Sequence, residues 1–464
     1  CYLWIFFKKN GKMMMSLCIK EFFAMKKRHH LSSTQRIMLF FLLAILAGSF
    51  ILVLPISHQK GVSVSYIDAL FTATTSVCVT GLVTLPTYST WSVFGQIVIL
   101  ILIQVGGLGI VTVMSGIMIG FHKRIGLDGR MLIQDAFNLN SLSGIIDFTK
   151  KVLIGTFIVE GVGALLYMTV FIPEFGPKGI WISFFNSISA FCNAGFDLMG
   201  VRAECSSLTS VASNWYVNLI ICTLIVVGGL GFFVWKNIID SKFRFKRMNL
   251  HTKIVIVVSI LLIIGGAFVL FGFCYSSDAY YGMSLSEKVL ASIFQSVSAR
   301  TAGFNTVDLA KLTDVGKFLM ICLMLVGGSP GSTAGGMKTT TLAVLVLSVV
   351  TTFRHRKSTE AFGRRFEEGL TRTAACIFML YIFLACSSAV IISHIEAISF
   401  IDALFETISA VATVGLTVGI TSSLSTFSCL LLCFLMLFGR VGSITMLLAF
   451  SSNRNKKISS FPLE

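Results

Sequence analysis

Long apolar stretches alternate with short polar segments along the whole chain. Eight of the stretches are long enough to cross a bilayer, and they occur in pairs. Between the two members of each pair lies an apolar segment that is too short to span. The first members lie near residues 37–57, 150–172, 253–274 and 372–393, and the second near 92–120, 215–235, 317–350 and 426–450. This pattern predicts an all-α polytopic membrane protein with eight transmembrane helices and four re-entrant half-helices.

The short segments share a motif that reveals a fourfold internal repeat. Each ends in small residues and a glycine, as in "DALFTATTSVCVTGL", "ISFFNSISAFCNAGF", "ASIFQSVSARTAGF" and "DALFETISAVATVGL". The terminal glycines are Gly81, Gly195, Gly303 and Gly415. Because self-similarity at a fixed spacing indicates a reused structural unit, we expect four units around one central pore. Their predicted bounds are 37–121, 122–240, 241–352 and 353–450, between an N-terminal arm, 1–36, and a tail, 451–464.

We expect each short segment to form a helix whose start is capped by a polar side chain. Asp68 and Asp402 stand where two of these helices should begin, and Ser286 stands at the third. Side chains of these types accept hydrogen bonds from the first backbone N–H groups of a helix. The opposite ends of the helices, which carry the negative end of the helix dipole, would then point toward the shared centre.

The charges set the expected orientation of the chain. Charged residues make up 12% of the sequence, about half of the share in soluble domains, and the net charge is +16. Lys and Arg gather in alternate connecting segments, so both termini are predicted to be cytoplasmic. This distribution also argues against nucleic acid as the partner of the basic residues. The basic segments are 26–36, 123–151, 236–253, 354–372 and 454–457.

Two features of the sequence argue against extracellular or redox chemistry. The first thirty residues lack a signal-peptide cleavage pattern, and translation starting at Met13, Met14, Met15 or Met25 would leave a short basic cytoplasmic arm. The twelve cysteines are scattered and form no CxxC pair, so we interpret them as small buried hydrophobic residues.

The four glycine tracts are predicted to bind a cation. Non-helical backbone at membrane depth is tolerated only where it is buried in protein or lines a water-filled cavity. A glycine at positive φ lets successive carbonyls turn toward one axis and replace the hydration shell of a cation. Close helix packing is the alternative for one tract, but four equivalent tracts favour a ring. Its ligands would be the carbonyls of Val79, Thr80, Gly81, Asn193, Ala194, Gly195, Thr301, Ala302, Gly303, Thr413, Val414 and Gly415.

The third unit carries a second unusual segment, "VGGSPGSTAGGMKTTT", within its second apolar stretch. Pro330 cannot donate a backbone hydrogen bond and glycines disfavour helix, so we expect the helix to break there and resume near Thr339. The resulting intramembrane loop, 327–338, suits a gate. A passive kink is the alternative. Nucleotide binding is disfavoured because Met337 separates Gly336 from Lys338 and the flanking segments are membrane helices.

Arg440 is predicted to meet this loop. Gly106-Gly107 and Gly327-Gly328 follow their terminal glycines by 25 and 24 residues, and in the fourth unit the pair is Gly439-Arg440. An arginine deep in a membrane helix faces a cavity or a partner. The residues predicted to form the gate are Gly327, Gly328, Ser329, Pro330, Gly331, Ser332, Thr333, Ala334, Gly335, Gly336, Lys338 and Arg440.

Glu160 lies inside the first apolar stretch of the second unit. It could pair with Arg440 or Lys338, or it could be a packing carboxylate that is hydrogen-bonded to its neighbours. The sequence favours the second interpretation.

Three stretches, "TATTSVCVTGL", "RTAGFNT" and "GGSPGSTAGGMKTTT", closely resemble the membrane subunits of the Trk/Ktr/HKT superfamily of potassium transporters, above all the bacterial Ktr membrane subunit. The resemblance runs from Arg36 to the C-terminus. It implies four M1-P-M2 units around a potassium filter, gated by the intramembrane loop, in a homodimer in the bacterial plasma membrane. It also implies regulation by a cytoplasmic Rossmann-type nucleotide-binding ring. A glycine at all four filter positions goes with potassium selectivity in this family.

The predicted function is therefore potassium uptake across the cell membrane, with K⁺ as the transported ion and no cofactor held by the chain. The resemblance implies sodium dependence, with Na⁺ as a coupling ion, whereas the residues themselves leave sodium-coupled, proton-coupled and channel-like flux open. A less selective sodium and potassium transporter is the alternative. A polytopic enzyme is disfavoured because the seven histidines are scattered and form no catalytic cluster, and a receptor or scaffold without transport is disfavoured by the repeated tracts.

Overall fold

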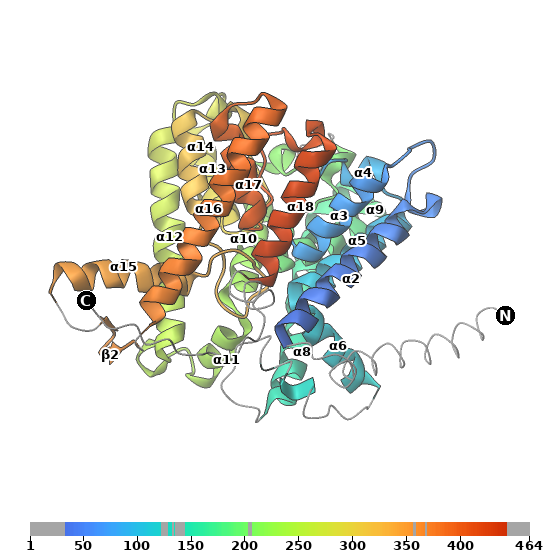
Figure 1. Ribbon diagram of the computed structural model, residues 1–464. Helices are drawn as coiled ribbons and strands as arrows, with labels where there is room; N and C mark the ends of the chain where they lie inside the picture. The colour runs from blue at the N-terminus through green and yellow to red at the C-terminus, as the bar shows by residue number, and fades with distance from the viewer. Residues whose placement is uncertain are drawn as a thin grey trace, which may run out of the picture.

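The computed structural model describes residues 33–121, 129–131, 134, 144–202, 207–355, 359–366 and 369–442. In this part of the chain the helices form one bundle (Figure 1). Its only sheet is a two-stranded hairpin, β1 (Glu360–Ala361) and β2 (Arg364–Arg365), in which Glu360 lies opposite Arg365. The all-α prediction is confirmed for these residues. The predicted tail and nearly all of the predicted arm lie outside them, as do many of the basic residues between the apolar stretches.

The same set of helices recurs four times. The long helices, which begin the units, are α2 (Ser33–Val53), α8 (Ile145–Phe175), α12 (Leu250–Cys274) and α16 (Leu370–Glu396). The short helices are α3 (Tyr66–Cys78), α9 (Lys178–Cys192), α13 (Leu285–Ser298) and α17 (Phe400–Val411). The return helices are α5 (Val93–Leu108), α10 (Trp215–Leu230), α14 (Asp314–Met324) and α18 (Thr426–Val441). One short helix, α4 (Thr87–Thr90), precedes α5.

The return helices of the first two units are bent, which corrects the prediction of continuous spans over 92–120 and 215–235, and the third is broken as predicted. Gly109 separates α5 from α6 (Ile110–Gly120) with a bend of 102°, and Gly231 separates α10 from α11 (Phe232–Asp240) with a bend of 91°. The helix α18 ends at Gly442, also at positive φ. In the third unit the break is a loop between α14 and α15 (Thr339–Phe353), and it begins before Pro330. The sequence did carry a signal for these helix ends, since a glycine or a proline stands three residues after the first glycine of each pair.

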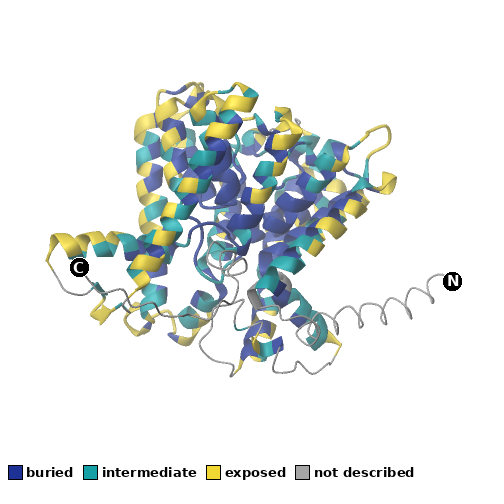
Figure 2. Cartoon of the chain, viewed as in Figure 1, coloured by how far each residue is buried: buried dark blue, intermediate teal, exposed yellow. Residues whose placement is uncertain are grey.

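Four of the described helices, the long ones, are long and apolar enough to cross a membrane, and counting each bent pair as one span gives six. The eight predicted spans are therefore not all visible as single helices. Large apolar side chains such as Phe50, Leu261 and Phe268 are exposed on the outer faces of the long helices. Figure 2 shows buried residues at the centre of the bundle and exposed residues on its periphery. This is the distribution that a surrounding bilayer requires.

Serines, and not the predicted residues, cap three of the four short helices, and α9 follows Pro177 without a side-chain cap. The hydroxyls of Ser65 and Ser399 accept the backbone N–H of Asp68 and Asp402, which stand three residues later, within the first turn. Ser284 and Glu287 form a reciprocal capping box in the third unit, so Ser286 is not the cap either. The predicted cap positions were wrong because the acidic residues occupy the position that reaches back to the cap in a capping box.

The four units close into a ring. Each short helix packs most extensively against the long helix of its own unit. Each return helix also packs against the short helix of the next unit, and α18 packs against α3, so the last unit contacts the first. The phenylalanines repeated in the short helices, Phe71, Phe185, Phe294 and Phe405, are all completely buried. The short helices therefore form the core of the bundle.

The orientation predicted from the charges can be tested by cysteine labelling. Lys246, in the turn before α12, and Ala310, in the turn before α14, are both exposed. We expect Lys246→Cys to react only with a membrane-permeant maleimide, because its segment is predicted to be cytoplasmic, and Ala310→Cys to react with an impermeant one. The parent chain supplies the background, since its Cys322 and Cys376 are exposed. Labelling of Lys246→Cys by the impermeant reagent in sealed cells would reverse the topology.

Candidate functional site

The backbone after each short helix makes the same two turns. Val79, Asn193, Thr301 and Thr413 adopt the left-handed conformation, with φ between 53° and 64°. Two residues later the terminal glycines also have positive φ, from 70° to 100°. Left-handed backbone is costly for residues with a Cβ, and it persists here in all four units. The four predicted tracts therefore share one backbone geometry.

The four glycines lie next to one another around a common centre. A Cβ built on Gly81 would lie 2.6 Å from the carbonyl oxygen of Ala194, and one on Gly303 would lie 2.7 Å from that of Val414. The Cβ of Gly195 would face the Ala302 carbonyl, and that of Gly415 would face the Thr80 carbonyl. Each glycine thus faces the residue before the glycine of the next unit. No side chain fits at these positions without displacing a neighbouring tract.

Hydrogen bonds to the short helices hold the tracts in place. The N–H groups of Thr80, Ala194 and Val414 donate to carbonyls five residues earlier, at 2.8–2.9 Å. In the third unit, where the spacing from the buried phenylalanine to the glycine is one residue shorter, Ala302 donates to Ser298 at 3.0 Å. The N–H groups of Gly81 and Gly415 donate to the hydroxyls of Thr75 and Ser409. The amides are thereby satisfied internally, as membrane burial requires.

The loop of the third unit lies directly against these tracts. Gly327 donates its N–H to the Met337 carbonyl at 2.8 Å, so the two ends of the loop meet. Thr333 donates its N–H to Gly228 and its hydroxyl to Phe191, at the end of α9. On the other side, a Cβ on Gly336 would lie 2.6 Å from the carbonyl oxygen of Ala412, beside the fourth tract. The loop therefore bridges the second and fourth units.

Arg440 contacts the loop, as the alignment of the glycine pairs predicted. Its guanidinium donates to the carbonyls of Thr333 in the loop and of Gly106 and Gly107 at the end of α5. Lys338 turns back onto the loop and donates to the carbonyl of Ala334 at 2.8 Å. Hydrogen bonds to charged groups are worth about 1.5–3 kcal/mol each. The first, third and fourth units are thus connected by one side chain.

Glu160 is a packing carboxylate, as the sequence favoured. Both of its oxygens accept from the amide of Gln104 at 3.0 Å, and the Cys192 thiol donates to the Gln104 carbonyl oxygen at 3.2 Å. No ion pair joins Glu160 to Arg440 or Lys338, both of which are described. Glu160 therefore ties α8 to α5 behind the second tract.

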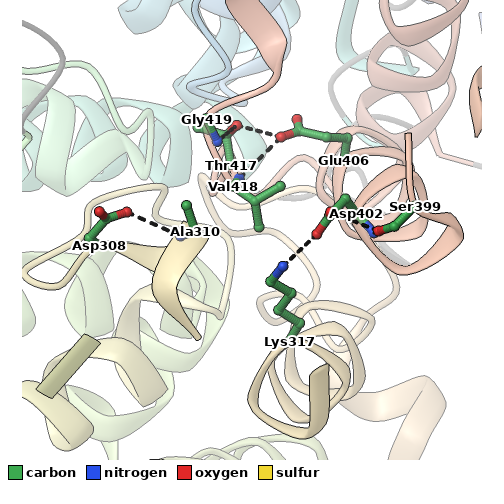
Figure 3. A network of polar contacts seen from close by, with 9 residues as sticks. All are labelled: Asp308, Ala310, Lys317, Ser399, Asp402, Glu406, Thr417, Val418 and Gly419. Atoms are coloured by element: carbon green, nitrogen blue, oxygen red, sulfur yellow. Dashed lines mark hydrogen bonds and ion pairs between the residues drawn. The ribbon is translucent and has the colours of Figure 1, made fainter. Parts of the chain in front are cut away.

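The structure also shows polar contacts between units that sequence reasoning missed. Lys317 on α14 forms an ion pair with Asp402 on α17 at 2.7 Å (Figure 3). At the equivalent place between the first two units, Gln96 on α5 accepts from the indole N–H of Trp181 on α9 at 2.8 Å. Gln96 and Lys317 each stand ten residues before the first glycine of their unit's glycine pair, Gly106 and Gly327. The position recurs but the residue type does not, so the sequence carried no signal for these contacts.

No cluster of three or more His, Cys, Asp or Glu side chains that could hold a metal occurs among the described residues. The nine cysteines in this part of the chain are free. Four of them are buried, but Cys322 and Cys376 are exposed, which corrects the prediction that they are buried hydrophobic residues throughout.

Comparison with known proteins identifies relatives over almost the whole chain. The family model described as TrkH, cation transport protein, matches residues 10–459. The potassium/sodium uptake protein NtpJ of Enterococcus hirae is 38% identical over 454 residues, covering 95% of this chain and 98% of that protein. Ktr system potassium uptake protein B of Bacillus subtilis is 35% identical over 420 residues, covering 90% and 93%.

A solved structure has the same fold. The crystal structure of the potassium transporter TrkH from Vibrio parahaemolyticus superposes with a TM-score of 0.72, covering 90% of this chain and 85% of that one, at 17% identity.

Proposed function

Because the chain belongs to the TrkH family of cation transport proteins, we propose that it takes up potassium ions across a bacterial plasma membrane. The observation that carries this proposal is the ring of four glycine tracts, whose backbone carbonyls form closely spaced neighbours around one centre. Backbone carbonyls in such a ring replace the water around a cation without any side chain. The printed names of the relatives, which are uptake proteins for potassium, support the choice of ion.

The selectivity ring in this proposal consists of the carbonyls of the four tracts named above. K⁺ passes through it as the transported ion, and Na⁺ serves as a coupling ion. The name of the Enterococcus relative includes sodium, which keeps a less selective sodium and potassium transporter as the second candidate. The glycine at all four positions favours potassium.

The gate in this proposal is the intramembrane loop together with Arg440. The loop lies beside the starts of the second and fourth tracts, through the contacts of Thr333 with Phe191 and of Gly336 with Ala412. Arg440 adds a positive charge in a site that water screens poorly, so it repels cations. Its guanidinium also holds the loop, because it donates one hydrogen bond to Thr333 and two to the end of α5. Opening then requires the loop to leave these partners.

The assembly in this proposal has eight spans with both termini cytoplasmic, in a homodimer surrounded by membrane lipids. The name of the Bacillus relative assigns it to a Ktr system, which supports a separate regulatory subunit. We infer that a cytoplasmic Rossmann-type nucleotide-binding ring docks on the basic cytoplasmic segments. These include Lys242, Arg244 and Lys246, which are exposed between α11 and α12.

The filter is tested by replacing Gly81 with Ser. The added Cβ would lie within 2.6 Å of the Ala194 carbonyl and so displace the second tract. We expect the preference for K⁺ over Na⁺ to fall at least tenfold, the equivalent of about 1.4 kcal/mol. The measurement is competition by Na⁺ in rubidium uptake into proteoliposomes.

Gly61→Ser is the matched control, since Gly61 has positive φ and no atom near its Cβ position. Unchanged competition in a folded Gly81→Ser protein would refute the four-tract ring.

The gate is tested by deleting Ser332 to Gly335 and by Arg440→Ala. Both changes remove the contact between the loop and Arg440, and lowering a barrier by about 1.4 kcal/mol raises a rate about tenfold. We therefore expect initial rubidium uptake to rise about tenfold or more. Arg440→Lys keeps the charge but loses the fork of donors, so its effect should be intermediate.

Arg202→Ala serves as the control for the gate experiment. This change removes an arginine that is bonded to Glu174 and to the Ser210 carbonyl, away from the tracts, and uptake should stay at the parent rate. Size exclusion separates closure from misfolding. If the deleted and Arg440→Ala proteins fold and conduct no faster than the parent, the loop is a passive kink.

A further inference from the structure

The residue that follows the buried phenylalanine in each short helix is polar in all four units. These residues are Thr72, Asn186, Gln295 and Glu406. All four are at least 97% buried, and Glu406 is completely buried. A buried carboxylate is costly unless hydrogen bonds satisfy it. Glu406 must therefore have hydrogen-bond partners within the core of the ring.

Glu406 binds the segment that follows the fourth tract (Figure 3). One of its oxygens, Oε1, accepts the hydroxyl of Thr417 and the backbone N–H of Val418, the latter at 3.2 Å. The other, Oε2, accepts the hydroxyl of Thr421 at 3.0 Å. Thr417 in turn accepts the N–H of Gly419 at 2.8 Å. One carboxylate thus fixes five residues that begin two positions after Gly415.

The second unit repeats this contact with a neutral side chain. Asn186 accepts the backbone N–H of Leu198 at 3.2 Å. Leu198 and Val418 both stand three residues after the terminal glycine of their unit. In the third unit the side chain of Gln295 has no hydrogen-bond partner among the described residues. The contact is therefore a recurring feature of opposite units, and it is strongest where the side chain is a carboxylate.

The fourth tract is held from both sides as a result. Ser409 on α17 accepts the N–H of Val414 with its carbonyl and that of Gly415 with its hydroxyl. Glu406, one turn earlier on the same helix, holds the chain beyond the glycine. The ion pair between Lys317 and Asp402 fixes the start of this helix to the third unit. The position of the tract relative to α17 is thus set at each end.

We propose that Glu406 is a positioning residue for ion selectivity, which holds the outer end of the fourth tract through Thr417 and Val418. Asn186 does the same for the second tract with a weaker contact. This inference rests on the proposed function, because it assigns the tracts a role in selecting the ion. It predicts that selectivity depends on an acceptor side chain that never touches the ion.

The test measures how strongly K⁺ and Na⁺ each inhibit rubidium uptake. The ratio of the two effects reports the selectivity, and size exclusion checks that each variant folds. Glu406→Gln keeps the shape and one acceptor for Val418 but loses the acceptor for Thr421. Thr417→Val removes the hydroxyl at a partly exposed position without changing the volume. We expect both to lower the ratio by about threefold to tenfold, the upper limit being equivalent to about 1.4 kcal/mol. Uptake of rubidium alone should stay within about twofold of the parent, since the path itself remains open.

Glu396→Gln is the matched control. Glu396 belongs to the same unit and accepts the N–H of Ser425 and the hydroxyls of Ser425 and Ser428, but it anchors α18 and not the tract. Its replacement should leave the ratio unchanged. Glu406→Asn, which places the side chain of the second unit in the fourth, should retain more selectivity than Glu406→Ala. A purely structural role would not move the ratio.

Gly415→Ser separates this inference from the proposed function. If Gly415→Ser lowers the ratio while folded Glu406→Gln and Thr417→Val proteins keep it, the filter stands and the role of Glu406 is refuted. If Gly415→Ser also leaves the ratio unchanged, the filter itself is refuted. Should Glu406→Gln fail to fold, Thr417→Val decides alone.

Discussion

The need to satisfy the backbone of four non-helical tracts at membrane depth governs the rest of this structure. Each tract leaves its short helix through a left-handed residue, at a cost of about 1–2 kcal/mol for a side chain with a Cβ. In return, its amides turn back to the helix that it has just left. Carbonyls that are not used in this way are free to face the common centre. The left-handed backbone and the internal hydrogen bonds of the tract are therefore two consequences of one turn, repeated four times.

This constraint also explains the break in the return helices. The first glycine of each pair in the first, second and fourth units packs directly on a carbonyl near the end of a short helix, for example Gly228 on Phe191. A continuous helix past that point would fill the space beneath the ring. Gly109 and Gly231, both at positive φ, instead turn the chain aside with bends of 102° and 91°, and α18 ends at Gly442. In the third unit a loop occupies this space, so the fourfold arrangement is broken at the place where a gate is proposed.

The repeat could be read from the sequence because its marks are spaced regularly and need no knowledge of side-chain contacts. The glycines at 81, 195, 303 and 415, the loop and its contact with Arg440 all followed from aligning the units. The caps and the helix breaks were missed for a different reason. A serine three residues before an aspartate reads as an ordinary loop residue, and a glycine such as Gly231 within an apolar run reads as a packing position. Only the backbone conformation shows which of two nearby polar residues caps the helix, and at which glycine the helix bends.

The contacts between units could not be predicted, because equivalent positions carry different residues. Ten residues before the return glycine stand Gln96, Asn218, Lys317 and Cys429, and no substitution pattern links them. Their roles emerge from their partners: Gln96 binds the indole of the next unit, and Lys317 binds a carboxylate. A homotetramer would be obliged to use the same contact four times. A single chain with four units can instead place the loop in the third unit, and Arg440 and Glu406 in the fourth. Divergence among the repeats thus allows each unit of a fourfold ring to make different contacts with its neighbours.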